Sequence, residues 1–168
     1  MSILASVVLF VAVAAAAEAA YVNQLGQPFD FKCPPGQIIS HIGSDYDLLL
    51  EDRQWEFRCR AANVSEVCSS SGYVNGFGLP LAFTCPGNQV LAGVQSYHDN
   101  QVEDRRFNFR CCDLRSKAPR GCLHGSDVNT WGGKLLLEVP RGKAIKGAVS
   151  SHDVTFEDRV WKFQICDI

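Results

Sequence analysis

The stretch Glu51-Asp52-Arg53-Gln54-Trp55-Glu56-Phe57 decides the fold, because it returns twice in nearly the same form. It reads Glu-Asp-Arg-Arg-Phe-Asn-Phe at residues 103–109 and Glu-Asp-Arg-Val-Trp-Lys-Phe at residues 157–163. In each copy aromatic side chains alternate with polar ones, which is the period of a β-strand with one buried face. The sequence therefore predicts one kind of strand that occurs three times.

The similarity extends on the N-terminal side of this stretch. Residues 21–59 align with residues 73–111 without a gap, and 17 of the 39 positions are identical. A third copy, residues 128–166, aligns with the first at an offset of 106. We expect one domain in which three like units bury a common core and pair their strand edges.

Each unit is predicted to contain about four strands. Besides a strand ending in the repeated stretch, the pattern indicates one around residues 29–33, a short one near Val22, and one after a proline-containing turn, at residues 37–44, 89–96 and 143–150. The connectors, residues 60–72 and 112–127, are rich in Ser, Gly and charged residues and are expected to be surface loops. The fold class is all-β with pseudo-threefold closure, which a β-prism and a β-trefoil both satisfy.

The N-terminus has the pattern of a secretory signal peptide. Residues 1–19 are mostly apolar and end in small residues, with Ala17 and Ala19 placed for cleavage. The apolar run is shorter than a comfortable membrane span, so we expect a secreted protein with a single domain at residues 20–168. Without Glu18 this domain has 17 acidic and 16 basic residues, a balance that argues against nucleic acid as a partner.

Eight cysteines in a secreted chain predict four disulfides. Equivalent positions in the first two units suggest Cys33–Cys59 and Cys85–Cys111, and the connector cysteines then suggest Cys68–Cys112 and Cys122–Cys166. Because Cys111 and Cys112 are adjacent, Cys68 with Cys111 and Cys85 with Cys112 is the alternative. Asn63-Val64-Ser65 is a glycosylation sequon in a connector.

The repeated stretch is interpreted as mainly structural. An arginine and a carboxylate would form a charge-assisted bond at the start of the strand while the aromatic residues fill the core. The residues in question are Glu51, Asp52, Arg53, Trp55, Glu103, Asp104, Arg105, Phe107, Glu157, Asp158, Arg159 and Trp161.

The segments before the repeated stretch are the candidate ligand contacts, because they vary within a constant frame. Each places an aspartate beside an aromatic or imidazole ring, and we expect each to lie on a loop, where binding residues concentrate. Acidic and amide groups beside rings suit a sugar. The alternative is a turn whose aspartate caps its own backbone. The candidates are Asp45, Tyr46, Asp47, Tyr97, His98, Asp99, Asn100, His152 and Asp153.

An enzyme, a cofactor site and a metal site are not indicated. Adjacent carboxylates such as Glu51 and Asp52 do not present two opposed groups across one cleft, as glycoside hydrolysis needs. With all eight cysteines assigned to disulfides, no thiol nucleophile remains, and no phosphate loop or zinc spacing occurs. His98 and His152 stand in isolated His-Asp pairs rather than in a ligand cluster.

The chain resembles the dermatopontin family, in its invertebrate form. The resemblance rests on Val-Asn near each unit start, Cys-Pro-x-Gly-Gln at 33–37, Asp-Arg-Gln-Trp-x-Phe at 52–57, the Cys111-Cys112 pair and Asp-Arg-x-Trp-Lys-Phe at 158–163. It implies a secreted matrix or adhesion protein, with agglutinin-like binding of glycans or glycoproteins of the matrix or cell surface. The alternative is a purely structural matrix protein that acts through protein contacts and self-assembly as a homo-oligomer.

The unit is also similar to the repeats of vitelline membrane outer layer protein, which is a β-prism. That similarity favours the prism over the trefoil.

Overall fold

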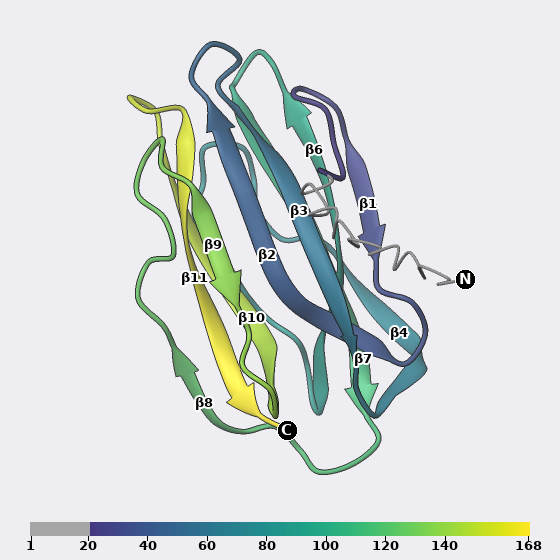
Figure 1. The fold of residues 1–168 in the computed structure, drawn as a ribbon. Helices are drawn as coiled ribbons and strands as arrows, with labels where there is room; N and C mark the ends of the chain where they lie inside the picture. Colours follow the sequence, from purple (N-terminus) through teal and green to yellow (C-terminus); the bar gives the residue numbers. More distant parts are fainter. Residues whose placement is uncertain (1–20) are drawn as a thin grey trace, which may run out of the picture.

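The computed structural model describes residues 21–168, so the expected signal peptide lies outside the described residues. These residues form eleven β-strands (Figure 1). No helix in them is long and apolar enough to cross a membrane. The strands are β1 (Phe29–Lys32), β2 (Gln37–Asp47), β3 (Asp52–Ala61), β4 (Val64–Tyr73), β5 (Leu81–Thr84), β6 (Gln89–Asp99), β7 (Asp104–Leu114), β8 (Arg120–His124), β9 (Leu135–Glu138), β10 (Lys143–Asp153) and β11 (Asp158–Asp167).

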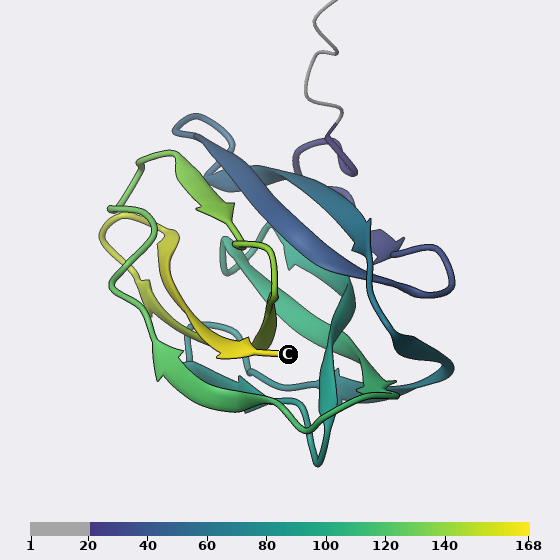
Figure 2. The same ribbon diagram turned by 60° about the horizontal axis from the view of Figure 1, so that its bottom comes forward.

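The strands form three antiparallel sheets, in the orders β1-β6-β7-β4, β5-β10-β11-β8 and β3-β2-β9. The first strand of each sequence unit pairs with a strand of another unit, as Phe29 with Ser96, Leu81 with Ser150 and Leu135 with Ser44. The register is therefore the same at all three junctions. Seen from below, the three sheets surround a common interior (Figure 2).

Two strand predictions are corrected by the structure. The units contribute three strands each rather than four, because the segment near Val22 is not a strand: the Val22 N–H donates to the Trp55 carbonyl at 2.7 Å in an isolated bond. The two connectors are not plain loops, since each contains a strand, β4 or β8, that joins the edge of a sheet.

A third correction concerns the candidate ligand segments. The strands predicted to stop at Ser44, Ser96 and Ser150 each continue for three more residues, to Asp47, Asp99 and Asp153. Asp47 pairs with Asp52 at the end of the hairpin, and the other two hairpins match it. The hairpin ladder continues to the turn and extends these strands, so the candidate residues lie largely at strand ends rather than on loops.

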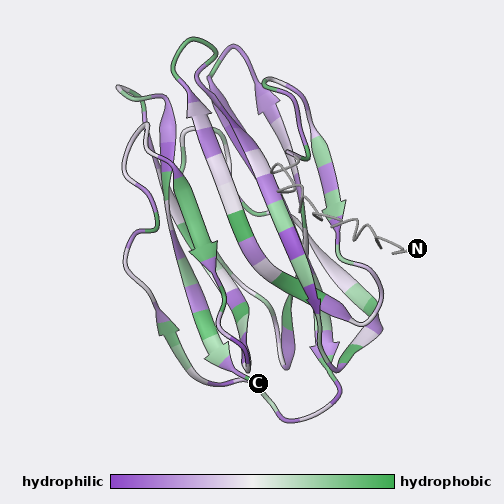
Figure 3. Ribbon diagram, in the orientation of Figure 1, coloured by the Kyte–Doolittle hydropathy of each residue, from purple (hydrophilic) through white to green (hydrophobic). Residues whose placement is uncertain are grey.

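The interior is filled by the aromatic residues of the repeated stretch. Trp55, Phe107 and Trp161 meet edge to face, with ring centroids 4.8 to 5.6 Å apart, and each is at most 3 % exposed. Hydrophobic and hydrophilic residues alternate along β3, as one buried face requires (Figure 3). The expectation that these aromatic residues form the core is confirmed.

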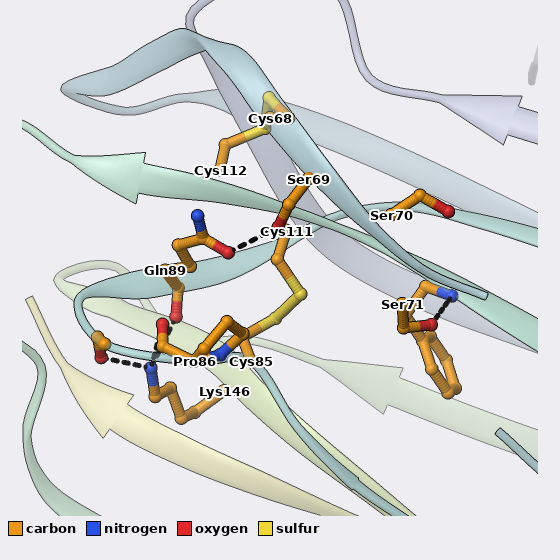
Figure 4. The surroundings of a disulfide bond; sticks show 12 residues. Cys68, Ser69, Ser70, Ser71, Cys85, Pro86, Gln89, Cys111, Cys112 and Lys146 are labelled. Carbon is orange, nitrogen blue, oxygen red and sulfur yellow. Dashed lines mark hydrogen bonds between the residues drawn. A yellow bond between two sulfur atoms is a disulfide. The ribbon is translucent and has the colours of Figure 1, made fainter.

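Four disulfides reinforce the sheets, and they have the first of the two pairings considered. Cys33–Cys59 and Cys85–Cys111 each join the residue that follows one strand, β1 or β5, to a strand of another sheet, β3 or β7. Cys68–Cys112 and Cys122–Cys166 instead attach β4 to β7 and β8 to β11 (Figure 4 shows the first of these). The adjacent cysteines separate because neighbouring strand residues point to opposite faces.

Candidate functional site

Three hairpin turns lie at one end of the molecule, the upper end in Figure 1. They join β2 to β3, β6 to β7 and β10 to β11, and we call this the hairpin end. An aspartate at the start of each turn binds the turn backbone: Asp47 Oδ1 accepts from the Leu49 and Leu50 N–H groups at 2.9 Å. Asp99 and Asp153 do the same in their turns. These three candidate residues therefore serve the turns.

A glutamate with a left-handed backbone closes each turn. Glu51, Glu103 and Glu157 have φ angles of 45°, 41° and 45°, in a region where residues other than glycine are uncommon. Such a conformation costs on the order of 1 kcal/mol or more and concentrates at functional sites. A glycine would adopt this angle without the cost, so the three strained positions make these glutamates candidates for a function.

A closed ring of ion pairs lies beneath the glutamates. Arg53 binds Asp158, Arg159 binds Asp104, and Arg105 binds Asp52, each through two N–H···O bonds of 2.6 to 2.7 Å. All six residues are at most 4 % exposed. Each pair joins two sequence units, so the ring connects all three. The predicted arginine–carboxylate bond is present, but its partner comes from another unit.

The carboxylates of the ring also hold the loops that begin each unit. The Gly26 N–H donates to Asp52 Oδ2 at 2.7 Å, and Gly78 and Gly132 bind Asp104 and Asp158 in the same way. Each arginine Nη2 donates to a loop carbonyl at 3.0 Å, that of Gln27, Leu79 or Gly133. The ring therefore fixes the hairpin end to the surrounding loops.

A small cavity of about 20 Å³ lies among these groups. Its lining includes the three glutamates, the ion-pair ring, Trp55 and Phe107. The Nη1 atoms of Arg53, Arg105 and Arg159 are buried and have no hydrogen-bond partner. These Nη1 atoms are out of reach of a water molecule, so the cavity offers a bound group mainly the glutamate carboxylates as acceptors. Its volume suffices for one water-sized group but not for a whole sugar ring.

Tyr46, His98 and His152 occupy equivalent positions in the three units. The Tyr46 hydroxyl donates to the Phe156 carbonyl at 2.7 Å, and burial together with nearby carboxylates raises the pKa of Tyr46 to about 12. The two histidine side chains are 2 % exposed, and their Nε2 atoms lie 3.5 to 3.7 Å from the glutamate of their own hairpin. Tyr46 and His98 line the cavity.

The remaining candidates lie outside the cavity lining. Asp45 accepts hydrogen bonds from Tyr21 and, at 3.2 Å, from Lys134. Burial alone would raise the pKa of Asp45, but these two donors outweigh it and hold that pKa below its ordinary value. Tyr97 packs edge-on against Tyr73, and Asn100 binds the ring of His98 at 2.8 Å.

Exposed apolar side chains lie at the tips of the turns, outside the cavity lining. Leu49 is 91 % exposed and Val154 is 73 % exposed, and both stand beside the turn aspartates. Phe156 stacks on Trp131, with parallel rings 5.8 Å apart. The hairpin end thus combines carboxylate acceptors and exposed apolar side chains. In residues 21–168 no group of three or more His, Cys, Asp or Glu side chains is arranged to hold a metal ion.

The sequence pattern assigns the three glutamates to the repeated stretch, interpreted as structural, and the turn aspartates to the candidate ligand contacts. The structure gives the opposite arrangement: the glutamates line the cavity, and the aspartates bind the backbone of the turns. A glutamate next to an aspartate in a repeated triplet gives no sign of its backbone angle. The signal that could have found it is the three-residue gap between the turn-capping aspartate and the glutamate.

Comparison with known proteins identifies the family of the chain. The family model for dermatopontin matches residues 23–168. The chain belongs to the dermatopontin family. Dermatopontin from Biomphalaria glabrata is 65 % identical to it over 147 residues, which cover 88 % of this chain and 99 % of that protein. This match supports the invertebrate form of the family that the sequence motifs indicate.

More distant relatives of the chain include a protein named a haemagglutinin. The haemagglutinin/amebocyte aggregation factor of Limulus polyphemus is 38 % identical over 149 residues, covering 88 % of this chain and 87 % of that protein. Human dermatopontin is 28 % identical over 152 residues, covering 87 % and 76 %. No solved structure matches the chain.

Proposed function

We propose that this chain is a secreted protein of the extracellular matrix that binds glycans at the hairpin end. The single observation that carries the proposal is the cavity, where the glutamates of all three units lie together above the buried ion-pair ring. The hydroxyl group of a sugar can donate a hydrogen bond to such carboxylates. The Limulus relative is named a haemagglutinin, which supports glycan binding as the shared activity.

The size of the cavity determines how a glycan would bind. Only one hydroxyl enters the cavity of about 20 Å³, and the ring lies across the rim. The apolar C–H face of the ring then packs on side chains at the tips of the turns, such as Leu49 and Val154. Tyr46 lines the cavity at the position that His98 occupies in the second unit, and this difference makes the lining asymmetric, which would select among sugars.

A glycan array, with competition by the free sugars, tests the proposal. The combined variant Glu51→Gln, Glu103→Gln and Glu157→Gln is expected to weaken binding at least tenfold, because it replaces three charged acceptors with neutral amides. Glu66→Gln, at an exposed carboxylate on β4, is the matched control and should leave binding unchanged. A silent array, or full binding by the triple variant, would contradict the proposal.

The described residues form one such cavity at the hairpin end, and this has a consequence for agglutination. Bridging two cells needs at least two binding sites, so a single chain would bind cells without joining them. We therefore expect haemagglutination to depend on association of chains, while binding on the array does not. Chains held monomeric by dilution should still bind the array but lose haemagglutination.

We also infer that the fold is a β-prism rather than a β-trefoil. The support is the division into three separate sheets, each completed by one strand of another unit at the same register. A crystal structure tests this directly, since a trefoil would instead close a single barrel.

Secretion rests on the predicted cleavage after Ala19. N-terminal sequencing of the protein from the culture medium of expressing cells should give Ala20 as the first residue. Retention in the cells, or an uncleaved N-terminus, would contradict this part of the proposal.

A further inference from the structure

The three sheets share a plan but differ at one edge. In two of them a fourth strand covers the last strand of the hairpin: β4 pairs with β7, and β8 pairs with β11. In the third sheet, order β3-β2-β9, no strand among residues 21–168 pairs with the outer edge of β3. This uncovered edge distinguishes the third sheet from the other two.

Only the upper part of the β3 edge has backbone partners. The Trp55 carbonyl accepts from the Val22 N–H at 2.7 Å, and the Trp55 N–H donates to Asn23 Oδ1 at 2.8 Å. Because backbone groups alternate in direction along an antiparallel strand, those of Phe57 and Cys59 face the same edge. At the equivalent position in β7, the Phe109 N–H donates to Ser71 Oγ at 2.9 Å.

Burial reflects the same difference. Cys85 and Cys111, beside the covered edge, are each 1 % exposed, whereas the equivalent pair Cys33 and Cys59 is half-buried. Phe57 is 8 % exposed and its equivalent Phe109 is 2 % exposed. An uncovered edge of this kind is a template for pairing with another chain.

The connectivity of the chain explains the uncovered edge. β4 leads directly into Tyr73-Val74-Asn75, and the equivalent residues of the first unit are Tyr21-Val22-Asn23. A fourth strand for the third sheet would therefore have to precede Tyr21. A proposal for this edge therefore rests on the predicted removal of residues 1–19 as a signal peptide.

We propose that the outer edge of β3 binds an extended segment of another protein as the fourth strand of this sheet, antiparallel to β3. Such strand addition is a common mode of peptide recognition, in which main-chain hydrogen bonds give affinity and side chains give selectivity. β4 and β8 show that the fold accepts a strand at this place in its other two sheets.

The side chains of β3 specify the chemistry of the segment. Transferring the β4 register, in which Ser70 faces Arg110 and Cys68 faces Cys112, puts two alternate residues of the segment opposite Arg58 and Arg60. The Arg58 side chain is 60 % exposed. The Arg60 guanidinium binds the carbonyls of Val139, Pro140 and Lys143, whereas Arg58, though paired with Glu56, stays largely exposed. An acidic residue is therefore favoured mainly opposite Arg58, as opposite charges stabilise cross-strand pairs.

A second copy of this chain fits the edge poorly. If two β3 strands pair about Cys59, Arg58 of one lies opposite Arg60 of the other, and like charges repel. If they pair about Phe57, the partner strand collides with Val22 and Asn23 at Trp55. The charges and the geometry therefore both favour a different protein.

Synthetic peptides with the sequence of residues 65–73, changed at two or three positions, test the proposal. The acidic peptide carries the changes Cys68→Asp and Ser70→Glu, and the basic peptide carries lysine at the same two places. A third peptide adds Ser69→Pro to the acidic one and so lacks the N–H that faces the equivalent of Cys59. Calorimetry and amide NMR of the secreted protein should show the acidic peptide binding at least tenfold more tightly than the other two.

The variant Arg58→Glu should reverse the preference between acidic and basic peptides. Arg110→Glu is the matched control, because β4 already occupies the equivalent edge, and it should change neither affinity. No binding of the acidic peptide at millimolar concentration, or equal binding of all three, would overturn the proposal. Protection of the Phe57 and Cys59 amides that rises with protein concentration alone would assign the edge to a second copy instead.

Discussion

The sheet β1-β6-β7-β4 and the sheet β3-β2-β9 have nearly the same hairpin and the same contacts to the ion-pair ring. They differ because the connector before the second unit supplies β4, whereas residues 21–28 supply no strand before the first. The comparison shows that the repeated residues specify the interior of each sheet, while chain connectivity determines whether its edge is covered. It also explains the position of Cys68–Cys112, which attaches a strand with few core contacts of its own.

The ion-pair ring is the part that all three sheets share, and breaking it should have the largest effect. Asp104→Ala leaves Arg159 buried without its partner and should lower the free energy of unfolding by about 3–5 kcal/mol. Urea unfolding measures this. Asp52→Ala in the other sheet should cost the same within about 1 kcal/mol, and the exposed Asp113→Ala should cost little. Unequal losses for Asp52 and Asp104 would show that the ring is not shared equally.

Removing the disulfide of β4 should make the covered sheet resemble the open one. Cys68→Ala with Cys112→Ala opens a loop of 44 residues, and the chain-entropy model gives a loss of up to about 4 kcal/mol. The Phe109 amide should then exchange at a rate closer to that of Phe57. If Phe109 stays as protected as before, β4 is held by its ladder alone.

The hairpin end should show a smaller, pH-dependent effect at Glu157. Burial is the main cause that raises the pKa of Glu157, so the ionised carboxylate destabilises the folded state. That cost is complete above the folded pKa and disappears below the unfolded value of about 4.3. Glu157→Gln should therefore raise the melting temperature at pH 7 and leave it unchanged near pH 3. A gain of equal size at both pH values would exclude ionisation as its cause.

The smallest effect is expected at the tips of the turns. Leu49→Ser removes an apolar side chain that is 91 % exposed, so the free energy of unfolding should change by less than about 0.5 kcal/mol. If the glycan proposal is right, the same variant weakens binding on the array. A loss of stability without a loss of glycan binding would instead assign Leu49 a structural role.

Much of the fold could be predicted from the sequence, because the alternation of Trp55 and Phe57 with polar residues indicates the buried face. The offset of 52 positions suggests Cys33–Cys59 and Cys85–Cys111, although the partner of Cys111 stays open until the structure is known. The connector strands could not be predicted, since Ser- and Gly-rich segments such as 68–72 have weak strand propensity and pair only because a sheet edge and a disulfide hold them.

The candidate site was predicted only in part. Tyr46 and His98 were among the candidates and do line the cavity, but the role of Glu51 depends on a left-handed turn that a glutamate does not signal. The partner of Arg53 is Asp158, 105 positions away, and only the closure of the three units brings them together.

Amide hydrogen exchange of the free, secreted protein, resolved by residue with NMR, tests the comparison most directly. The Phe57 and Cys59 amides should exchange on the order of 100-fold faster or more than those of Phe109 and Cys111, because only the second pair faces a covering strand. Equal protection of the two pairs in dilute protein would contradict an open edge on β3, and with it the account of how the sheets differ.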